Sequence, residues 1–312
     1  MKRRKSHSAA KSLVLTIILL VLIAVVVVLT LAGAKKRRAQ LLSSQQPTSV
    51  IQTLEETTEP ETEEGQLRFL DAHGDIYKMF IDPEVSPHPY DVSLFVNDGT
   101  ICSYEDDAYT SRRGIDVSAF QGDVDWQAVK AAGIEFVFLR LGYRGYGPEG
   151  SLHEDEKFKE YIVGAQTAGL DVGVYFFSQA VSEQEAVEEA EFCIDVLYPY
   201  ALQLPVVFDA ENIEHDDART DKIGGAQFTK NAVAFCDRIL QEGYYQTAIY
   251  SNLKWEAFMY DLEALADYPI WYADYEKQPQ TPYRFTWWQY SEKGSVPGIA
   301  GKVDLDIELI AK

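Results

Sequence analysis

Two carboxylates, Asp209 and Glu211, stand at the end of the apolar run LPVVF at residues 204–208. A short apolar run that opens with a proline is typical of a strand buried on both faces, as in a parallel sheet or barrel. Side chains alternate along a strand, so both acids should point to the same side, with Cα atoms about 6.5 Å apart. Two acids placed in this way can share one substrate. A strand that merely ends in a polar loop would look the same, so the rest of the chain must decide between these interpretations.

Strand-like and helix-like patterns alternate from residue 114 to the C-terminus. The expected strands are 114–118, 136–141, 171–177, 204–208, 246–250, 269–272, 284–290 and 303–308. The expected helices are 125–133, 154–169, 182–197, 226–243 and 254–266. Eight strands that alternate with helices predict an α/β fold, a closed or nearly closed TIM-like β/α barrel.

Acids and aromatic residues gather where these strands end. In a β/α barrel the active site lies at the carboxyl ends of the strands. Acids ringed by flat apolar faces suit a carbohydrate, whose sugar rings present C–H groups to aromatic side chains. Any one aromatic residue could equally belong to the core. The candidate substrate-binding residues are Tyr143, Tyr175, Tyr250, Trp271, Asp274, Trp288 and Gln289.

Eight motifs in this region resemble the glycoside hydrolase family 25 muramidases, the Chalaropsis-type lysozymes. The motifs are GIDVSAFQGDVDW, FVFLRLGYRGYG, VGVYFFSQA, PVVFDAE, AIYSN, PIWYADY, WWQYS and GKVDLDIE. The resemblance covers residues 114–312 and implies an irregular β/α barrel. It also implies cleavage of the β-1,4 bond between N-acetylmuramic acid and N-acetylglucosamine.

The resemblance further implies four acids in the cleft. Matched motif by motif, the catalytic candidates are Glu211, Asp209, Asp116 and Asp304, and Asp306 lies on the same strand face as Asp304. Many relatives have an aromatic residue between the paired acids, where this chain has Ala210, which we interpret as a packing change.

Our hypothesis gives Glu211 the role of general acid and Asp209 that of stabilising the positive charge of the transition state. A neighbouring carboxylate in a partly desolvated cleft should raise the pKa of Glu211. The other two acids would position this pair. Direct attack by Asp209 and assistance by the substrate's own acetamido group both remain open. The same-face spacing near 6 Å and the family resemblance both favour net retention.

Two rival functions belong to other classes. One is a catalytically inactive module that binds peptidoglycan at the membrane surface. The other is a metal-dependent hydrolase that uses the clustered aspartates. The five histidines contain no HxxH pair and the three cysteines no CxxC pair, so we expect no metal or other cofactor.

Residues 13–34 form an apolar stretch between two basic clusters, Lys2 to Lys11 and Lys35 to Arg38. Its length is enough to cross a bilayer as a helix, and it is too long for the core of a cleaved signal peptide. We therefore expect a cytoplasmic tail at 1–12, a single transmembrane helix at 13–34, an acidic flexible linker at 35–65, and an extracellular catalytic barrel at 113–312.

The charge of the chain restricts its partners. The 312 residues carry a net charge of −21, and most of the chain after residue 38 is more acidic still, because both basic clusters precede it. So acidic a body is not expected to bind nucleic acid. The expected partners are peptidoglycan glycan strands and, through the N-terminal helix, the membrane. We expect a monomer.

Residues 66–112 show short alternating runs separated by turn signals such as Asn97-Asp98-Gly99. Such signals predict β-hairpins. A β unit of this size has a marginal core of its own, so it should pack on its neighbour. Its role is open between a spacer or wall contact and a structural element.

We expect the full-length protein to remain with the cell, because an uncleaved transmembrane helix would hold it in the membrane. Immunoblots of the cell and medium fractions measure this directly. Release of the full-length chain into the medium would contradict the anchor.

Overall fold

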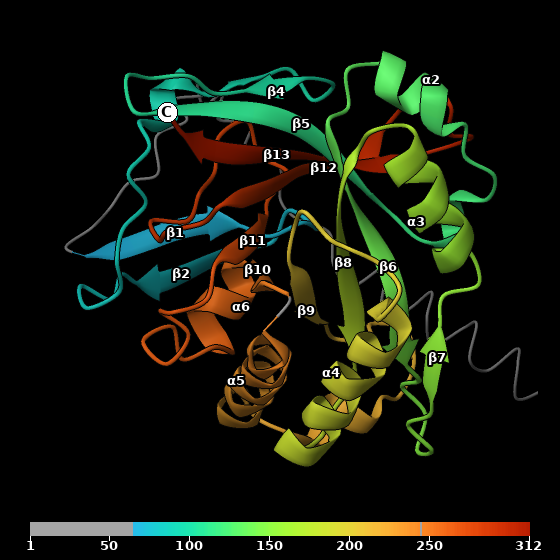
Figure 1. Cartoon of the computed structure of the whole chain (residues 1–312). Helices are drawn as coiled ribbons and strands as arrows, with labels where there is room; N and C mark the ends of the chain where they lie inside the picture. The colour runs from blue at the N-terminus through green and yellow to red at the C-terminus, as the bar shows by residue number, and fades with distance from the viewer. Residues whose placement is uncertain (1–64, 244) are drawn as a thin grey trace, which may run out of the picture. The chain divides into compact units, whose positions relative to one another are not determined.

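The structure, a computed structural model, describes residues 65–243 and 245–312 (Figure 1). The predicted cytoplasmic tail, transmembrane helix and nearly all of the linker lie outside the described residues. Among the residues that are described, no helix is both long enough and apolar enough to cross a membrane.

Eight strands of the described part of the chain close into a barrel (Figure 1). Around the barrel their order is β5-β13-β12-β11-β10-β9-β8-β6, and β6 pairs with β5 to close it. Seven strands run parallel, whereas β13 is antiparallel to both of its neighbours. In chain order the strands are β5 (Tyr109–Val117), β6 (Phe136–Arg144), β8 (Asp171–Ser178), β9 (Val206–Ala210), β10 (Thr247–Asn252), β11 (Ile270–Ala273), β12 (Trp287–Gly294) and β13 (Val303–Ala311). The predicted α/β barrel with eight strands is therefore present, as a mixed barrel.

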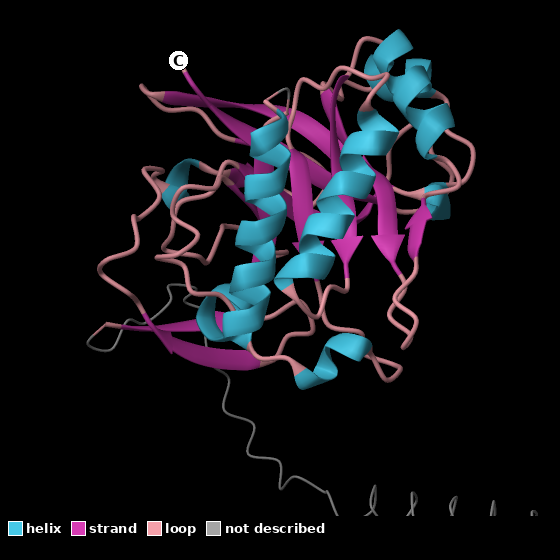
Figure 2. Cartoon of the chain, turned by 60° about the horizontal axis from the view of Figure 1, so that its bottom comes forward, coloured by secondary structure: helices cyan, strands magenta, loops and turns pink. Residues whose placement is uncertain are grey.

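Helices lie against the outside of these strands (Figure 2). They are α2 (Trp126–Ala131), α3 (Phe158–Thr167), α4 (Glu183–Leu197), α5 (Gly225–Glu242) and α6 (Leu253–Phe258). Ser182 caps α4 as its sequence predicts, because its side chain accepts the backbone N–H of Glu185. The connections from β11 to β12 and from β12 to β13 are wholly described and contain no helix, so the barrel is irregular.

Two predicted helices are shorter than expected. The helix predicted at 254–266 ends at Phe258, because the chain turns and the backbone N–H of Asp261 donates to Thr229 Oγ on α5 (3.0 Å). The helix predicted at 154–169 begins only at Phe158. Residues before it form β7 (Leu152–Glu154), which pairs with the outer part of β6.

The barrel interior has an apolar floor and a polar mouth. The floor contains the buried rings of Phe138 and Trp271, which stack with centroids 4.5 Å apart. A Cβ at Gly173 would lie 2.5 Å from the Phe138 ring, so glycine makes room for it. Because alternate residues of a strand share a face, the strand that places Val207 in the interior also turns Asp209 inward, at the mouth.

The segment before the barrel forms two small antiparallel pairs, β1 (Gln66–Leu70) with β2 (Ile76–Phe80) and β3 (Val96–Asn97) with β4 (Cys102–Ser103). A short 3₁₀ helix, η1 (Val92–Leu94), lies between them. The buried side chains of the whole segment before the barrel belong to the same hydrophobic core as the outer face of the barrel.

The boundary expected at residue 113 falls inside β5. That strand begins at Tyr109 and pairs with β13 as far as Ala311. The segment also covers part of the barrel, since the ring of Phe95 packs on Trp288 with centroids 5.2 Å apart. Residues 66–112 therefore continue the fold of the barrel.

We expect a fragment of residues 113–312 to be insoluble, or to unfold at a much lower temperature than a fragment of residues 65–312. The shorter fragment lacks part of β5 and exposes large aromatic side chains that are now buried. Thermal unfolding of both fragments, followed by circular dichroism, measures the difference. Equal melting temperatures would show that the segment packs on the barrel without stabilising it.

Candidate active site

Five acids lie at the mouth of the barrel, contributed by three strands and the residue after β9. Asp116, Asp209 and Asp306 are buried, whereas Glu211 and Asp304 are half-buried. Asp304 on β13 stands directly opposite Asp116 on β5 in the sheet register. The structure thus brings together all four acids predicted from the sequence, and Asp306 with them.

The charges of these acids act on one another. Burial raises the pKa of Asp116 well above its usual value, and the charges of Asp304 and Asp306 raise it further. Burial also raises the pKa of Asp304 to about 6. Like charges held together in a desolvated site favour the protonated form. The cluster therefore holds protons at pH values where exposed carboxyls have lost them.

Glu211 has a pKa raised to about 7, first by burial and then by the charges of Asp304 and Glu214. Burial and the charge of Glu211 also raise the pKa of Asp209, while the guanidinium of Arg140 opposes the rise. The Oδ1 atom of Asp209 is buried and has no hydrogen-bond partner among the described residues. A polar atom of this kind is available to a ligand or a proton.

Gln289 holds Asp116 in place. Its Nε2 donates to Asp116 Oδ2 (2.7 Å), and its Oε1 accepts from the hydroxyls of Tyr250 and Tyr275 (both 3.0 Å). Two donors on the oxygen fix the orientation of the amide. The structure therefore places Gln289 and Tyr250 behind the acids, where they orient them.

Two of the expected sugar-stacking residues have no free face. Trp288 is fully buried between Phe95 and Tyr290, and its indole N–H donates to the backbone oxygen of Asp274 (2.8 Å). Trp271 is fully buried in the floor, and its indole N–H donates to Asp306 Oδ1 (2.8 Å). The stacking role expected for both does not fit their burial.

The remaining candidates differ in exposure. Tyr143 and Tyr175 are half-buried, and the ring of Tyr143 stacks on that of His153 with centroids 5.1 Å apart. Asp274 is buried, accepts the Tyr272 hydroxyl (2.8 Å) and has a pKa raised by burial to about 6. It supports the loop after β11.

An exposed aromatic residue that sequence reasoning missed is Phe120. Its side chain is 85% exposed, in the 3₁₀ turn that follows Asp116 and β5. The guanidinium of Arg140 lies over the rings of Phe120 (4.8 Å) and Tyr143 (5.4 Å), and donates to Asp155 Oδ2 (2.7 Å). The signal was present in the sequence, since Phe120 lies in the same motif as Asp116.

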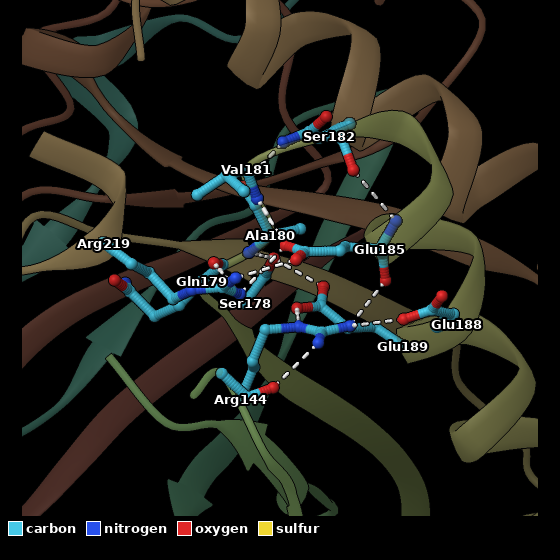
Figure 3. A network of polar contacts seen from close by, with 12 residues as sticks. Arg144, Ser178, Gln179, Ala180, Val181, Ser182, Glu185, Glu188, Glu189 and Arg219 are labelled. Carbon is cyan, nitrogen blue, oxygen red and sulfur yellow. Dashed lines mark hydrogen bonds and ion pairs between the residues drawn. The ribbon is translucent and has the colours of Figure 1, made fainter. Parts of the chain in front are cut away.

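A polar network at the end of β8 includes Ser178, Gln179 and Glu189 (Figure 3), and it fixes the backbone of Glu211. Gln179 is fully buried, its Nε2 donates to the backbone oxygen of Glu211 (3.0 Å), and its Oε1 accepts from Thr220 Oγ (2.9 Å). The neighbouring Ser178 donates to Glu189 (2.6 Å). Gln179 is therefore a positioning residue for Glu211, and its apolar surroundings gave no sequence signal for this role.

The same network joins β6 and α4 around a buried ion pair (Figure 3). Arg144 is 5% exposed and donates to Glu189 (2.7 Å) and to the backbone oxygens of Gly150 and Glu185 (both 2.8 Å). Arg219 donates to both oxygens of the Glu185 carboxylate (2.9 and 2.7 Å). The bonds of Arg219 hold the loop after β9 on the first turn of α4.

A pocket of about 360 Å³ opens beside Glu211. Residues from the ends of β10 and β11 form one side of it, among them Tyr250, Asn252 and Asp274. Within the described residues, no three His, Cys, Asp or Glu side chains converge as a metal ion would require. The metal-dependent alternative has no set of ligands in that part of the chain.

Comparison with known proteins identifies the family. The model of the family described as glycosyl hydrolases family 25 matches residues 115–299. The chain belongs to glycosyl hydrolases family 25. This match includes Asp116, Asp209 and Glu211, and it ends before Asp304.

Family 25 relatives include two curated lysozymes. The autolytic lysozyme of Clostridium acetobutylicum is 29% identical over 201 residues, and Lysozyme M1 of Streptomyces globisporus is 28% identical over 203 residues. Each match covers 62% of this chain. The matched regions span 55% and 66% of those two proteins, respectively.

Solved structures share the fold. The modular autolysin LytC from Streptococcus pneumoniae is 23% identical with a TM-score of 0.57, and the match covers 80% of this chain and 58% of LytC. The spore cortex lytic enzyme SleM from Clostridium perfringens is 26% identical with a TM-score of 0.55, over 64% of this chain and 67% of SleM. LytC has also been solved in complex with a synthetic peptidoglycan ligand.

Proposed function

We propose that this family 25 protein is a muramidase, which cleaves the β-1,4 bond between N-acetylmuramic acid and N-acetylglucosamine in peptidoglycan. The observation that carries the proposal is Glu211. This carboxyl lines the pocket, has a pKa raised to about 7, and follows the buried Asp209 by two residues at the end of β9. Acid-catalysed glycoside cleavage requires two carboxyls at one cleft, one that keeps its proton and one that is ionised, and the raised pKa suits Glu211 to the first role.

Glu211 acts as the general acid. With a pKa near 7, a large fraction of its carboxyl groups keeps its proton at neutral pH. The proton passes to the glycosidic oxygen as the bond from that oxygen to C1 breaks, and the leaving sugar departs with a 4-hydroxyl. Water then adds its hydroxyl to C1 and returns its proton to Glu211.

Asp209 stabilises the positive charge that develops on the sugar ring. Burial is the main cause of the raised pKa of Asp209 and the charge of Glu211 is the second, and only this second cause disappears while Glu211 is protonated. Arg140 then favours the ionised form of Asp209. Asp116 and Asp304 position the pair. Attack by Asp209 on C1 and participation of the substrate's acetamido group are both compatible with net retention.

The alternative is an inactive barrel that only binds peptidoglycan. Release of new reducing ends from purified peptidoglycan excludes this alternative, and their absence supports it. We further propose that residues 13–34 anchor the enzyme as a single-pass membrane protein with the barrel outside the cell. Retention of the full-length chain with the cell is the observation that this second proposal requires.

Glu211→Gln should lower the rate of reducing-end release by about 10²- to 10⁴-fold, the usual contribution of a general acid. Wild-type activity should fall as the pH rises through about 7, because the protonated form of Glu211 is then lost. The matched control is Glu263→Gln, an exposed residue outside the pocket. A folded Glu211→Gln variant with most of its activity would refute the assignment.

Phe120→Ala should weaken binding to glycan strands by about 1 kcal/mol, because a sugar face would lose its contact with an exposed ring. The melting temperature should change little, since the side chain is 85% exposed. Tyr198→Ala is the control, because Tyr198 is similarly exposed (86%) and lies at the end of α4. Isothermal titration measures the affinity, and equal affinities of the two variants would remove Phe120 from the binding surface.

A further inference from the structure

One wall of the pocket beside Glu211 comes from outside the family 25 region. The turn of the β1–β2 hairpin contributes the residues from Phe69 to His73 to the lining, whereas the family model begins at residue 115. We call the residues Leu70, Asp71, Ala72 and His73 the hairpin tip. The lining also includes Glu211 and Glu214, in the loop after β9.

A paired amide fixes the hairpin tip to the barrel. The backbone N–H of Leu70 donates to Gln280 Oε1, and Gln280 Nε2 donates back to the oxygen of Leu70 (both 2.9 Å). The backbone N–H of Gln280 also donates to Asp274 Oδ2 (2.8 Å), and Asp274 itself lines the pocket. The tip is thus tied to the loop that follows β11.

Two side-chain contacts hold the tip to other parts of the barrel. Lys254 on α6 lies 3.4 Å from Asp71, and its ammonium also lies over the ring of Tyr77 (4.9 Å). His73 Nε2 lies 2.7 Å from Glu214 Oε1, so the tip also touches the loop after β9. Contacts with three separate parts of the barrel place the tip in a defined position.

The lining of the pocket suits the uncharged hydroxyl and acetamido groups of a sugar. Of its five acids, Asp71 faces the ammonium of Lys254, and burial raises the pKa values of Glu211 and Asp274, while Glu214 and Glu292 complete the set. Tyr275 and Asn252 add an aromatic ring and an amide. A pocket of about 360 Å³ is of the size of small-molecule sites. Hydroxyl and acetamido groups on a sugar ring match this combination of ring faces, donors and acceptors.

We propose that the hairpin tip forms a subsite for the glycan strand, and that this subsite holds sugar units beyond the pair that flanks the cleaved bond. The inference rests on the proposed muramidase activity. It assigns the hairpin tip, Leu70 to His73, a direct part in substrate binding. The enzyme then favours long glycan strands over short fragments, because a long strand fills the subsite at the hairpin tip in addition to the sites of the two sugars that flank the cleaved bond.

The proposal is tested by a substitution that places a large side chain in the proposed subsite. Ala72 is exposed and lines the pocket, so Ala72→Trp places a ring there without disturbing the core. Lys78→Trp is the matched control, because Lys78 is exposed on the same hairpin and does not line the pocket. The substrates are long glycan strands freed of stem peptides and a chromogenic aryl glycoside of the repeating disaccharide. Melting temperatures verify that each variant is folded.

For Ala72→Trp we expect kcat/KM on long strands to fall about tenfold, equal to about 1.4 kcal/mol, with no change on the aryl glycoside. His73→Ala removes the contact with Glu214. It should also lower kcat/KM on long strands, through a higher KM. Lys78→Trp should behave as the wild type. Unchanged kinetics of Ala72→Trp on long strands, or an equal fall on both substrates, would overturn the subsite.

Binding separates this inference from the proposed activity. If the wild type cleaves neither substrate, the muramidase proposal fails, and isothermal titration of the peptide-free strands still decides the subsite. Weaker binding to Ala72→Trp than to Lys78→Trp supports the subsite, and equal binding refutes it. A tip that recognises only strands with attached stem peptides would show equal binding here and so would also refute it.

Discussion

The burial of several like charges in one place is the constraint on which this structure depends. Asp116, Asp209 and Asp306 are each at most 5% exposed at the barrel mouth. An isolated buried carboxylate is costly unless it is hydrogen-bonded or protonated. The protein uses both remedies, because Gln289 and Trp271 donate to two of these acids and burial raises the pKa of all three. The side chains around the acids in turn hold those donors in place, as the hydroxyls of Tyr250 and Tyr275 do for Gln289.

The aromatic residues of the barrel serve this need in two ways. Phe138 and Trp271 fill the floor and keep water from the acids above it, which sustains the raised pKa values. Trp271 also supplies a donor to Asp306, and Tyr250 orients the amide of Gln289. Residues that look like a carbohydrate platform in the sequence are thus partly a scaffold for the acids. The exposed ring beside the acids belongs to Phe120.

The sequence predicted those elements and site residues whose signal lies in residues adjacent along the chain. The barrel strands were predicted because each is an apolar run with a polar end, and the paired acids followed from the alternation of β9. The burial of Trp288 could not be read from its own neighbours in sequence, because Phe95, far away in the chain, covers it. The early end of α6 depends in the same way on a contact with Thr229. Gln179 has its role only because folding brings it to the backbone of Glu211.

The last strand, β13, lies between β12 and β5 and runs against both. It pairs Ile310 with Thr110, which lie far apart in the sequence. Until β13 has been synthesised, β5 and β12 each keep an open edge, and the cleft lacks Asp304 and Asp306. Barrel closure is therefore a late event that joins distant parts of the chain, a topology associated with slow folding. A nascent chain with two unpaired edges is exposed to wrong pairing during that interval, so a chaperone that shields strand edges would raise the yield of folded protein.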